Sequence, residues 1–169
     1  MRASMATIRP ATPDDLPAIL DITNDVIATS TAIYFDDPLN LDNRREWYEG
    51  RRKLGYPVLV AEEAGVVAGF SSFGDFRPWP GYRFTIEHSL LVRDGYRGKR
   101  IGEALVQTLW PIAASLGKHM IIAGVDAENA GSIRFHERLG FTKTAHLEEV
   151  GFKFGRRLDL VLLQKRVIP

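Results

Sequence analysis

Residues 90–102 read Leu-Leu-Val-Arg-Asp-Gly-Tyr-Arg-Gly-Lys-Arg-Ile-Gly, and this stretch decides the fold. An apolar run that favours a β-strand stops at Asp94-Gly95, a strong turn signal. A basic loop with Gly98 follows, and apolar residues then recur at helical spacing from Ile101 to Leu116. This order predicts an anion site, because the first N–H groups of a helix lack internal partners and the dipole places about half a positive charge there.

The loop matches neither of two common nucleotide-binding motifs. A P-loop has four residues between its first glycine and its Gly-Lys-Ser/Thr end, whereas only two residues separate Gly95 from Gly98. No GxGxxG sequence opens a strand–helix–strand unit here, so a Rossmann fingerprint is also absent. Taken alone, the loop fits a phosphate site and equally a solvated basic turn at the start of a surface helix.

The composition is that of an ordinary globular chain. Its 169 residues are 45% hydrophobic and 25% charged, with a net charge of +1, so no overall field favours nucleic acid or an acidic membrane. The absence of cysteine excludes disulfides, thiolate catalysis and cysteine-ligated zinc. The four histidines lack HExxH or similar spacing, and we expect no metal. Without a bilayer-spanning run or a signal-peptide core, we expect a cytoplasmic protein with no membrane partner.

The periodicity of the chain predicts alternating strands and helices in a single domain, residues 1–169. We expect strands near residues 7–9, 57–62, 66–76, 82–92, 119–125, 141–150 and 157–164. We expect helices near residues 12–28, 42–54, 130–139 and from about residue 99, with Thr12 and Asp42 as N-caps of the first two. This order suits an α/β fold with a mixed sheet and helices on both faces. The strands at 82–92 and 119–125 should be parallel, joined by a crossover.

Glu87 is an unusual residue within the expected strand at 82–92. Alternation places it on one face of the strand and His88 on the other. Glutamate is depleted in strands and rarely buried without a partner. Held near an anion site, the carboxylate can accept a proton from a bound nucleophile, directly or through water. The alternative is a structural salt bridge to Arg77, Arg83 or a neighbouring strand.

Residues 129–140 carry polar side chains along one face of a predicted helix. Asn129 suits an N-cap, which is compatible with a ligand contact. Ser132 lies in the first turn, where its hydroxyl could reach a bound polar group. His136 follows one turn later on the same face. A lone helical histidine is more often structural, and the proposed anion site nearby is what makes His136 a candidate.

The expected loop at residues 29–40 interrupts the helical period. It carries Tyr34 and Phe35, followed by Asp36-Asp37-Pro38. Two interpretations stay open: the aromatic rings pack within the surface loop, or they form one wall of a ligand pocket.

Taken together, these segments resemble the GNAT superfamily of N-acetyltransferases. The basic glycine loop is similar to its pyrophosphate loop, and Asn-x-x-Ser-x-x-x-His-x-x-x-Gly-Phe at residues 129–141 resembles its later cofactor segment. The likeness is closer still to the phosphinothricin and methionine sulfoximine N-acetyltransferase branch. Four further segments resemble that branch in order: Ser-Thr-Ala-Ile (30–33), Phe-Gly-Asp-Phe-Arg-Pro (73–78), Gly-Tyr-Arg-Phe-Thr-Ile-Glu-His-Ser (81–89) and Lys-Phe-Gly-Arg (153–156).

The resemblance covers nearly the whole chain and implies both a fold and an activity. The implied fold is the GNAT acyl-CoA N-acyltransferase fold, an α/β (α+β) arrangement with a mixed, largely antiparallel twisted sheet and helices on both faces. The implied activity is direct acetyl transfer from acetyl-CoA to a small amino-acid-like amine, of the phosphinothricin, methionine sulfoximine or methionine sulfone type. A homodimer is also implied.

The resemblance also assigns roles by position. Glu87 matches the general base, and His136 stands where many members have a tyrosine proposed to protonate the thiolate. The implied cofactor-binding residues are Leu90, Leu91, Val92, Arg97, Gly98, Lys99, Arg100, Ile101, Gly102, Glu103, Asn129 and Ser132. The implied acceptor-binding residues are Phe35, Arg77, Pro78, Trp79, Tyr82, Glu87, His88 and Ser89. An arginine in that set suits a carboxylate, because its fork donates two parallel hydrogen bonds.

One departure concerns the glycine loop, because Arg100 stands where the superfamily usually has a glycine. If that position needs a left-handed backbone, Arg100 strains it, and otherwise its charge favours the phosphate. Alternatives for the function also stay open. The acceptor could be a peptide N-terminus, a polyamine or an aminoglycoside, or the chain could be a CoA-binding sensor without catalysis. A covalent acetyl-cysteine route is excluded, because there is no cysteine.

Overall fold

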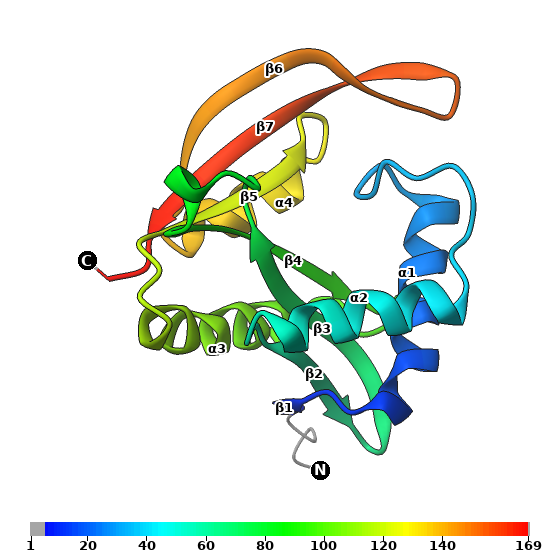
Figure 1. The fold of residues 1–169 in the computed structure, drawn as a ribbon. Coiled ribbons are helices and arrows are strands. Elements are labelled where there is room, and N and C mark those ends of the chain that lie inside the picture. The colour runs from blue at the N-terminus through cyan, green and yellow to red at the C-terminus, as the bar shows by residue number, and fades with distance from the viewer. Residues whose placement is uncertain (1–5, 169) are drawn as a thin grey trace.

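A computed structural model describes residues 6–168 (Figure 1); residues 1–5 and 169 of the expected domain lie outside the described residues. The described strands form one seven-stranded sheet in the order β1-β2-β3-β4-β5-β7-β6. The strands are β1 Thr7–Pro10, β2 Val58–Glu63, β3 Val66–Asp75, β4 Thr85–Val92, β5 Met120–Asp126, β6 Thr142–Lys153 and β7 Arg156–Arg166. The helices are α1 Leu16–Thr29, α2 Leu41–Lys53, α3 Ile101–Ser115 and α4 Ala130–Arg138, with 3₁₀ turns at Pro13–Asp15 and Pro80–Tyr82.

The pairing of β4 with β5 is the one parallel pair among the described strands, and the other neighbours are antiparallel. The predicted parallel crossover through α3 and the mixed, largely antiparallel sheet are therefore confirmed. The two parallel strands pair only over residues 85–87 and 120–122, although β4 continues to Val92 and β5 to Asp126. The sheet consequently opens between the carboxyl ends of these strands, beyond Glu87.

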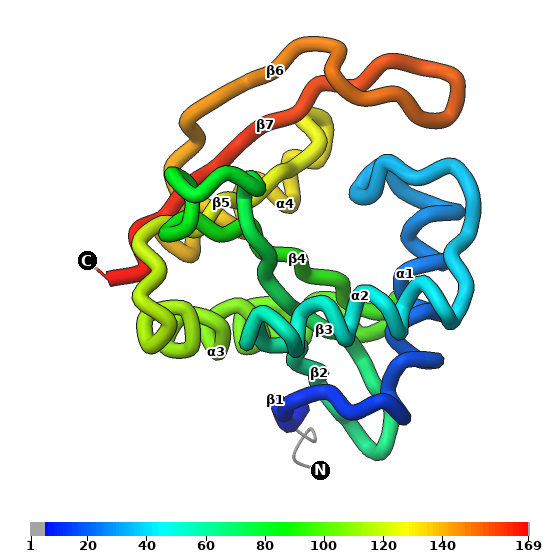
Figure 2. The backbone as a smooth tube through the Cα atoms, in the orientation of Figure 1, coloured from blue at the N-terminus to red at the C-terminus, as the bar shows by residue number. Residues whose placement is uncertain are grey.

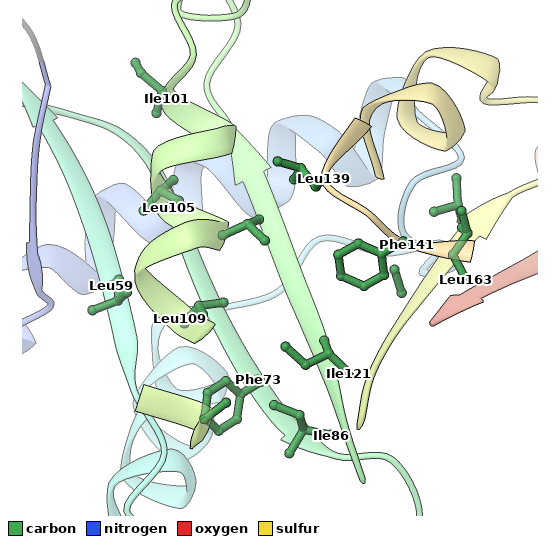
Figure 3. Close-up of a cluster of buried hydrophobic side chains, with 14 of the residues drawn as sticks. Leu59, Phe73, Ile86, Ile101, Leu105, Leu109, Ile121, Leu139, Phe141 and Leu163 are labelled. Atoms are coloured by element: carbon green, nitrogen blue, oxygen red, sulfur yellow. The ribbon is translucent and has the colours of Figure 1, made fainter. Parts of the chain in front are cut away.

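Helices cover both faces of the sheet, as predicted, and each face has its own apolar core. On one face, Leu105 and Leu109 of α3 pack over Phe73, Ile86 and Ile121 of the central strands (Figure 3). On the other face, α1 and α2 pack on β2 and β3. That second core contains the buried residues Ile19, Ile22, Tyr48, Val60 and Phe70.

The hairpin of β6 and β7 extends beyond the rest of the sheet toward the loop that follows α1 (Figure 2). Lys153, near the tip, is almost completely buried, and its ammonium donates to the carbonyl oxygens of Ser30 (2.6 Å) and Ile33 (2.7 Å). Tyr34 packs against the hairpin as well, since its ring fills the space that a side chain at Gly151 would need. The hairpin therefore fixes the loop at residues 30–35.

Some expected boundaries were wrong for local reasons. Asn40 rather than Asp42 caps α2: its side chain accepts from the N–H of Asn43 (2.9 Å), while Asp42 pairs with Arg45 (3.0 Å). The strand expected from residue 82 begins at Thr85, because Pro80 starts a 3₁₀ turn. Within residues 6–168, no helix combines the length and apolar character needed to cross a membrane.

Candidate functional site

Two adjoining cavities lie where β4 and β5 part. The first, here called the inner cavity, has a volume of about 500 Å³ and is lined by Glu87, His88 and His136 among others. The second, the loop cavity, has a volume of about 510 Å³ and follows the end of β4 into the start of α3. Both are lined by Leu90, Leu91, Asn129, Ser132 and Phe135, so the two cavities share a wall and form one continuous site.

The loop cavity brings together nearly all of the expected cofactor residues. It is lined by Leu90, Leu91, Val92, Arg97, Gly98, Arg100, Ile101, Gly102, Glu103, Asn129 and Ser132. The first intrahelical bond of α3 runs from the N–H of Ala104 to the carbonyl of Arg100 (3.1 Å), which leaves the preceding amides without helical partners. Lys99 does not line this cavity, because its ammonium pairs with Glu63 (3.1 Å). Free amides beside three arginines, the expected Arg97 and Arg100 and also Arg138 of α4, fit a diphosphate.

Two features of the loop depend on its backbone. Gly98 has a φ of +79°, a left-handed conformation that suits glycine. Arg100, the residue before α3, has φ 62° and ψ 13°, so this position is also left-handed, although arginine occupies it. Arg100 donates to the Glu103 carboxylate (3.0 Å), which lowers the pKa of Glu103. The departure from glycine therefore strains the backbone and places a charge that Glu103 partly neutralises.

The far end of β4 leaves one edge unpaired within the described sheet. Leu90, Leu91 and Val92 pair with β3 on one side, and the register with β5 ends at Glu87 on the other. Amide and carbonyl groups along this edge can bind an extended ligand as a further strand would. This feature fits the pantetheine arm of a CoA molecule.

Glu87 projects from β4 onto the sheet face covered by α1 and α2. Its register partner on β3 is Gly74, and a Cβ built on Gly124 of β5 would lie 3.0 Å from its Oε1 atom. Burial raises the pKa of Glu87, and the charge of Arg77 opposes that shift without cancelling it. Among residues 6–168, Glu87 forms no ion pair, so the salt bridge considered as the alternative is not found.

His88 and His136 form a buried pair on the opposite face. Their Nε2 atoms lie 3.1 Å apart, and His136 Nδ1 lies 2.7 Å from the carbonyl of Ser132. A carbonyl only accepts, so His136 Nδ1 carries the proton, and in the neutral pair His88 Nε2 donates to His136 Nε2. Burial lowers the pKa of both, to about 3 for His88. Proton donation by His136 therefore requires its bond to His88 to open.

The expected acceptor residues fall into two groups. Phe35, Glu87, His88 and Ser89 line the inner cavity. Arg77, Pro78, Trp79 and Tyr82 belong to the segment between β3 and β4 and line neither cavity. The Arg77 guanidinium lies over the ring of Phe76, 5.1 Å from its centroid.

Sequence reasoning missed a third wall of the inner cavity. Arg44, Trp47 and Arg51 of α2 line it, and Asp126 at the end of β5 also lines this cavity. The available signal was helical spacing, because positions three, four and seven residues apart share one face. Two arginines and a tryptophan on one face also suit a solvated helix, so the pattern alone did not indicate a site.

Comparisons with known proteins agree with this geometry. Residues 19–141 match the acetyltransferase (GNAT) family model. The chain is 49% identical to an L-methionine sulfoximine/L-methionine sulfone acetyltransferase of Salmonella typhimurium, over 94% of this chain and 92% of that protein. It is 35% identical to a phosphinothricin N-acetyltransferase of Alcaligenes faecalis, over 94% and 81%. A structure described as an acetyltransferase from Salmonella typhimurium with its cofactor acetyl-CoA superimposes with a TM-score of 0.94 at 47% identity, covering 98% and 96%. The chain belongs to the acetyltransferase (GNAT) family.

Proposed function

We propose that this chain transfers an acetyl group from acetyl-CoA to the amine of a small amino-acid-like acceptor, of the methionine sulfoximine, methionine sulfone or phosphinothricin type. Family membership and the activities for which its relatives are named support the proposal. The observation that carries it is the half-buried Glu87 carboxylate, which lines a cavity adjoining the glycine loop before α3. The proposal includes a single domain in a cytoplasmic protein.

The loop cavity would hold the cofactor. Amides between Gly98 and Glu103 would bind the diphosphate, and the open edge of β4 from Leu90 to Val92 would bind the pantetheine arm. The Asn129 side-chain oxygen accepts from the N–H of Ser132 (3.0 Å), so its NH₂ group stays available to donate to the arm. Acetyl-CoA supplies, when bound, an acetyl group activated as a thioester.

Glu87 would act as the general base. An acceptor amine is mostly ammonium near neutral pH and must lose a proton before it can attack a thioester. Glu87 takes that proton, directly or through a water. The raised pKa of its carboxyl brings it closer to the working pH, which makes it a stronger base than an ordinary glutamate. His136 as the proton donor to the thiolate stays a prediction that depends on opening the bond to His88.

A homodimer is part of the same proposal. The β6–β7 hairpin exposes a row of large apolar side chains, Leu147, Val150, Phe152 and Phe154. Exposed apolar groups of this kind favour association with another protein surface. Light scattering on the purified protein should give twice the mass of the chain, and a single-chain mass would remove the dimer from the proposal.

A panel of acceptors tests the function. Release of the CoA thiol should be fastest with L-methionine sulfone, L-methionine sulfoximine or phosphinothricin, and much slower with a peptide N-terminus, spermidine or an aminoglycoside. If none of these amines causes thiol release but acetyl-CoA binds tightly in a titration, the chain is a CoA-binding sensor and not an enzyme. Failure to bind acetyl-CoA would reject both.

A further inference from the structure

The face of α2 that lines the inner cavity carries two guanidinium groups held by one indole ring. The guanidinium carbons of Arg44 and Arg51 lie 4.9 Å and 5.9 Å from the ring centroid of Trp47. Trp47 in turn packs edge-on against Phe70 of β3, with ring centroids 5.9 Å apart. The packing of the indole on the sheet therefore holds both cations at the cavity wall.

Neither cation has a carboxylate partner within residues 6–168. Arg44 bonds the side-chain oxygen of Asn43 (2.8 Å), and the buried Nε of Arg51 has no hydrogen-bond partner in the described part of the chain. On the outer face of α2, by contrast, Arg45 pairs with Asp42 (3.0 Å). Burial lowers the pKa of Arg44 and Arg51; the charge of Arg51 adds to the shift of Arg44, and the charge of Asp75 opposes the shift of Arg51.

Arg51 lies against Gly74, the β3 residue that pairs with the proposed base. A Cβ built on Gly74 would lie 2.5 Å from its Nη1 atom, so the guanidinium occupies the space that a side chain at position 74 would need. Gly74 is the register partner of Glu87, and side chains of such partners project from the same face about 5 Å apart. A small ligand can therefore contact the guanidinium and the carboxylate at the same time.

The negative and positive side chains of the inner cavity come from different walls. Glu87 and Asp126 lie on the strand wall, and Arg44 and Arg51 lie on the helix wall. An α-amino acid has the complementary arrangement, with an ammonium and a carboxylate joined through one carbon. A polyamine offers only cations, which the two arginines repel.

We propose that Arg44 and Arg51 form the subsite that binds the α-carboxylate of the acceptor and turns its amine toward Glu87. This inference rests on the proposed function and extends it, because it restricts the acceptors to amines that carry a carboxylate. The planar forks of the two guanidiniums suit a carboxylate, and Trp47 keeps them in place.

The test compares two acceptors that differ only in the carboxylate. Initial rates are measured at one pH with L-methionine sulfone and with L-methionine sulfone amide, for wild type, Arg44→Gln and Arg51→Gln. We expect kcat/KM for the sulfone to fall about 10- to 100-fold, mostly through KM. For the amide we expect a change below about twofold. Arg45→Gln, on the solvent side of the same helix, is the control and should leave kcat/KM unchanged for both acceptors.

A second variant keeps both charges. Gly74→Ala forces the Arg51 guanidinium to shift, and it should reproduce the selective loss for the sulfone. Melting temperature and the KM for acetyl-CoA serve as checks that each variant is folded. Equal losses for both acceptors, or no loss for either, would overturn the subsite. A wild type that acetylates none of L-methionine sulfone, L-methionine sulfoximine and phosphinothricin would instead refute the proposed function, and the subsite with it.

Discussion

Gly124→Ala should move the proposed base without disturbing the fold. Gly124 lies in β5 and its φ is not positive, so alanine meets no backbone strain there. The new Cβ would lie 3.0 Å from Glu87 Oε1, whereas its next neighbour, Leu160 Cδ1, is at an ordinary 3.6 Å. The carboxylate must therefore give way by a few tenths of an ångström, and nothing else needs to move.

The size of the effect follows from that displacement. A misplacement of about 1 Å costs roughly 100-fold in rate, so a few tenths of an ångström should lower kcat about 4- to 10-fold. The free energy of unfolding should stay the same or rise by about 0.4 to 1 kcal/mol, because alanine restricts the unfolded chain more than glycine does. Steady-state kinetics and urea unfolding on the same preparations measure the two quantities.

Two controls separate this cause from others. Gly50→Ala, on α2 with nothing within 4 Å of the new methyl group, should leave kcat unchanged. In a Glu87→Gln background, Gly124→Ala should cause no further loss, because the base through which it acts is already gone. An unchanged kcat in the single variant, or an equal loss in both backgrounds, would refute the assigned position of Glu87.

Three further predictions concern residues around the site. Arg77→Gln removes the charge that lowers the pKa of Glu87, so that pKa should rise and the acid limb of the kcat/KM profile should move to higher pH; an unmoved limb would contradict this. Arg100→Gly relieves a left-handed arginine and should raise the melting temperature, whereas Arg100→Ala keeps the strain and should not; equal melting temperatures would show that the backbone is unstrained. Lys153→Met removes two hydrogen bonds to the loop at residues 30–35 and should cost about 2 to 4 kcal/mol in urea unfolding while raising the KM for the acceptor, because Phe35 lies in that loop. A loss below about 1 kcal/mol would mean that the loop holds its position without Lys153.

The features that could be predicted from the sequence are local along the chain. A strand, a glycine loop and a helix follow one another within residues 90–102, so an anion site and a parallel crossover could be expected before any contact was known. The period of two in β4 likewise placed Glu87 and His88 on opposite faces, as the structure has them. In these cases neighbouring residues determine the geometry.

The features that escaped prediction depend on packing between distant segments. Arg51 reaches the site because α2 crosses β3 at Gly74, where a missing side chain leaves room for a guanidinium. Lys99 was expected at the loop cavity, but its ammonium forms an ion pair with Glu63 at the end of β2 instead. The contact between His88 and His136 joins β4 to α4, and hydrophobic periodicity does not specify which residues meet across two elements.

The central claim is that Glu87 takes the proton from the acceptor amine. Its most direct test is the pH dependence of kcat/KM for acetylation of L-methionine sulfone, measured for wild type and Glu87→Gln. We predict a fall of at least about 100-fold near neutral pH and the disappearance of the acid limb. The affinity for acetyl-CoA should stay unchanged. A variant that keeps the wild-type rate and the same acid limb would contradict the claim.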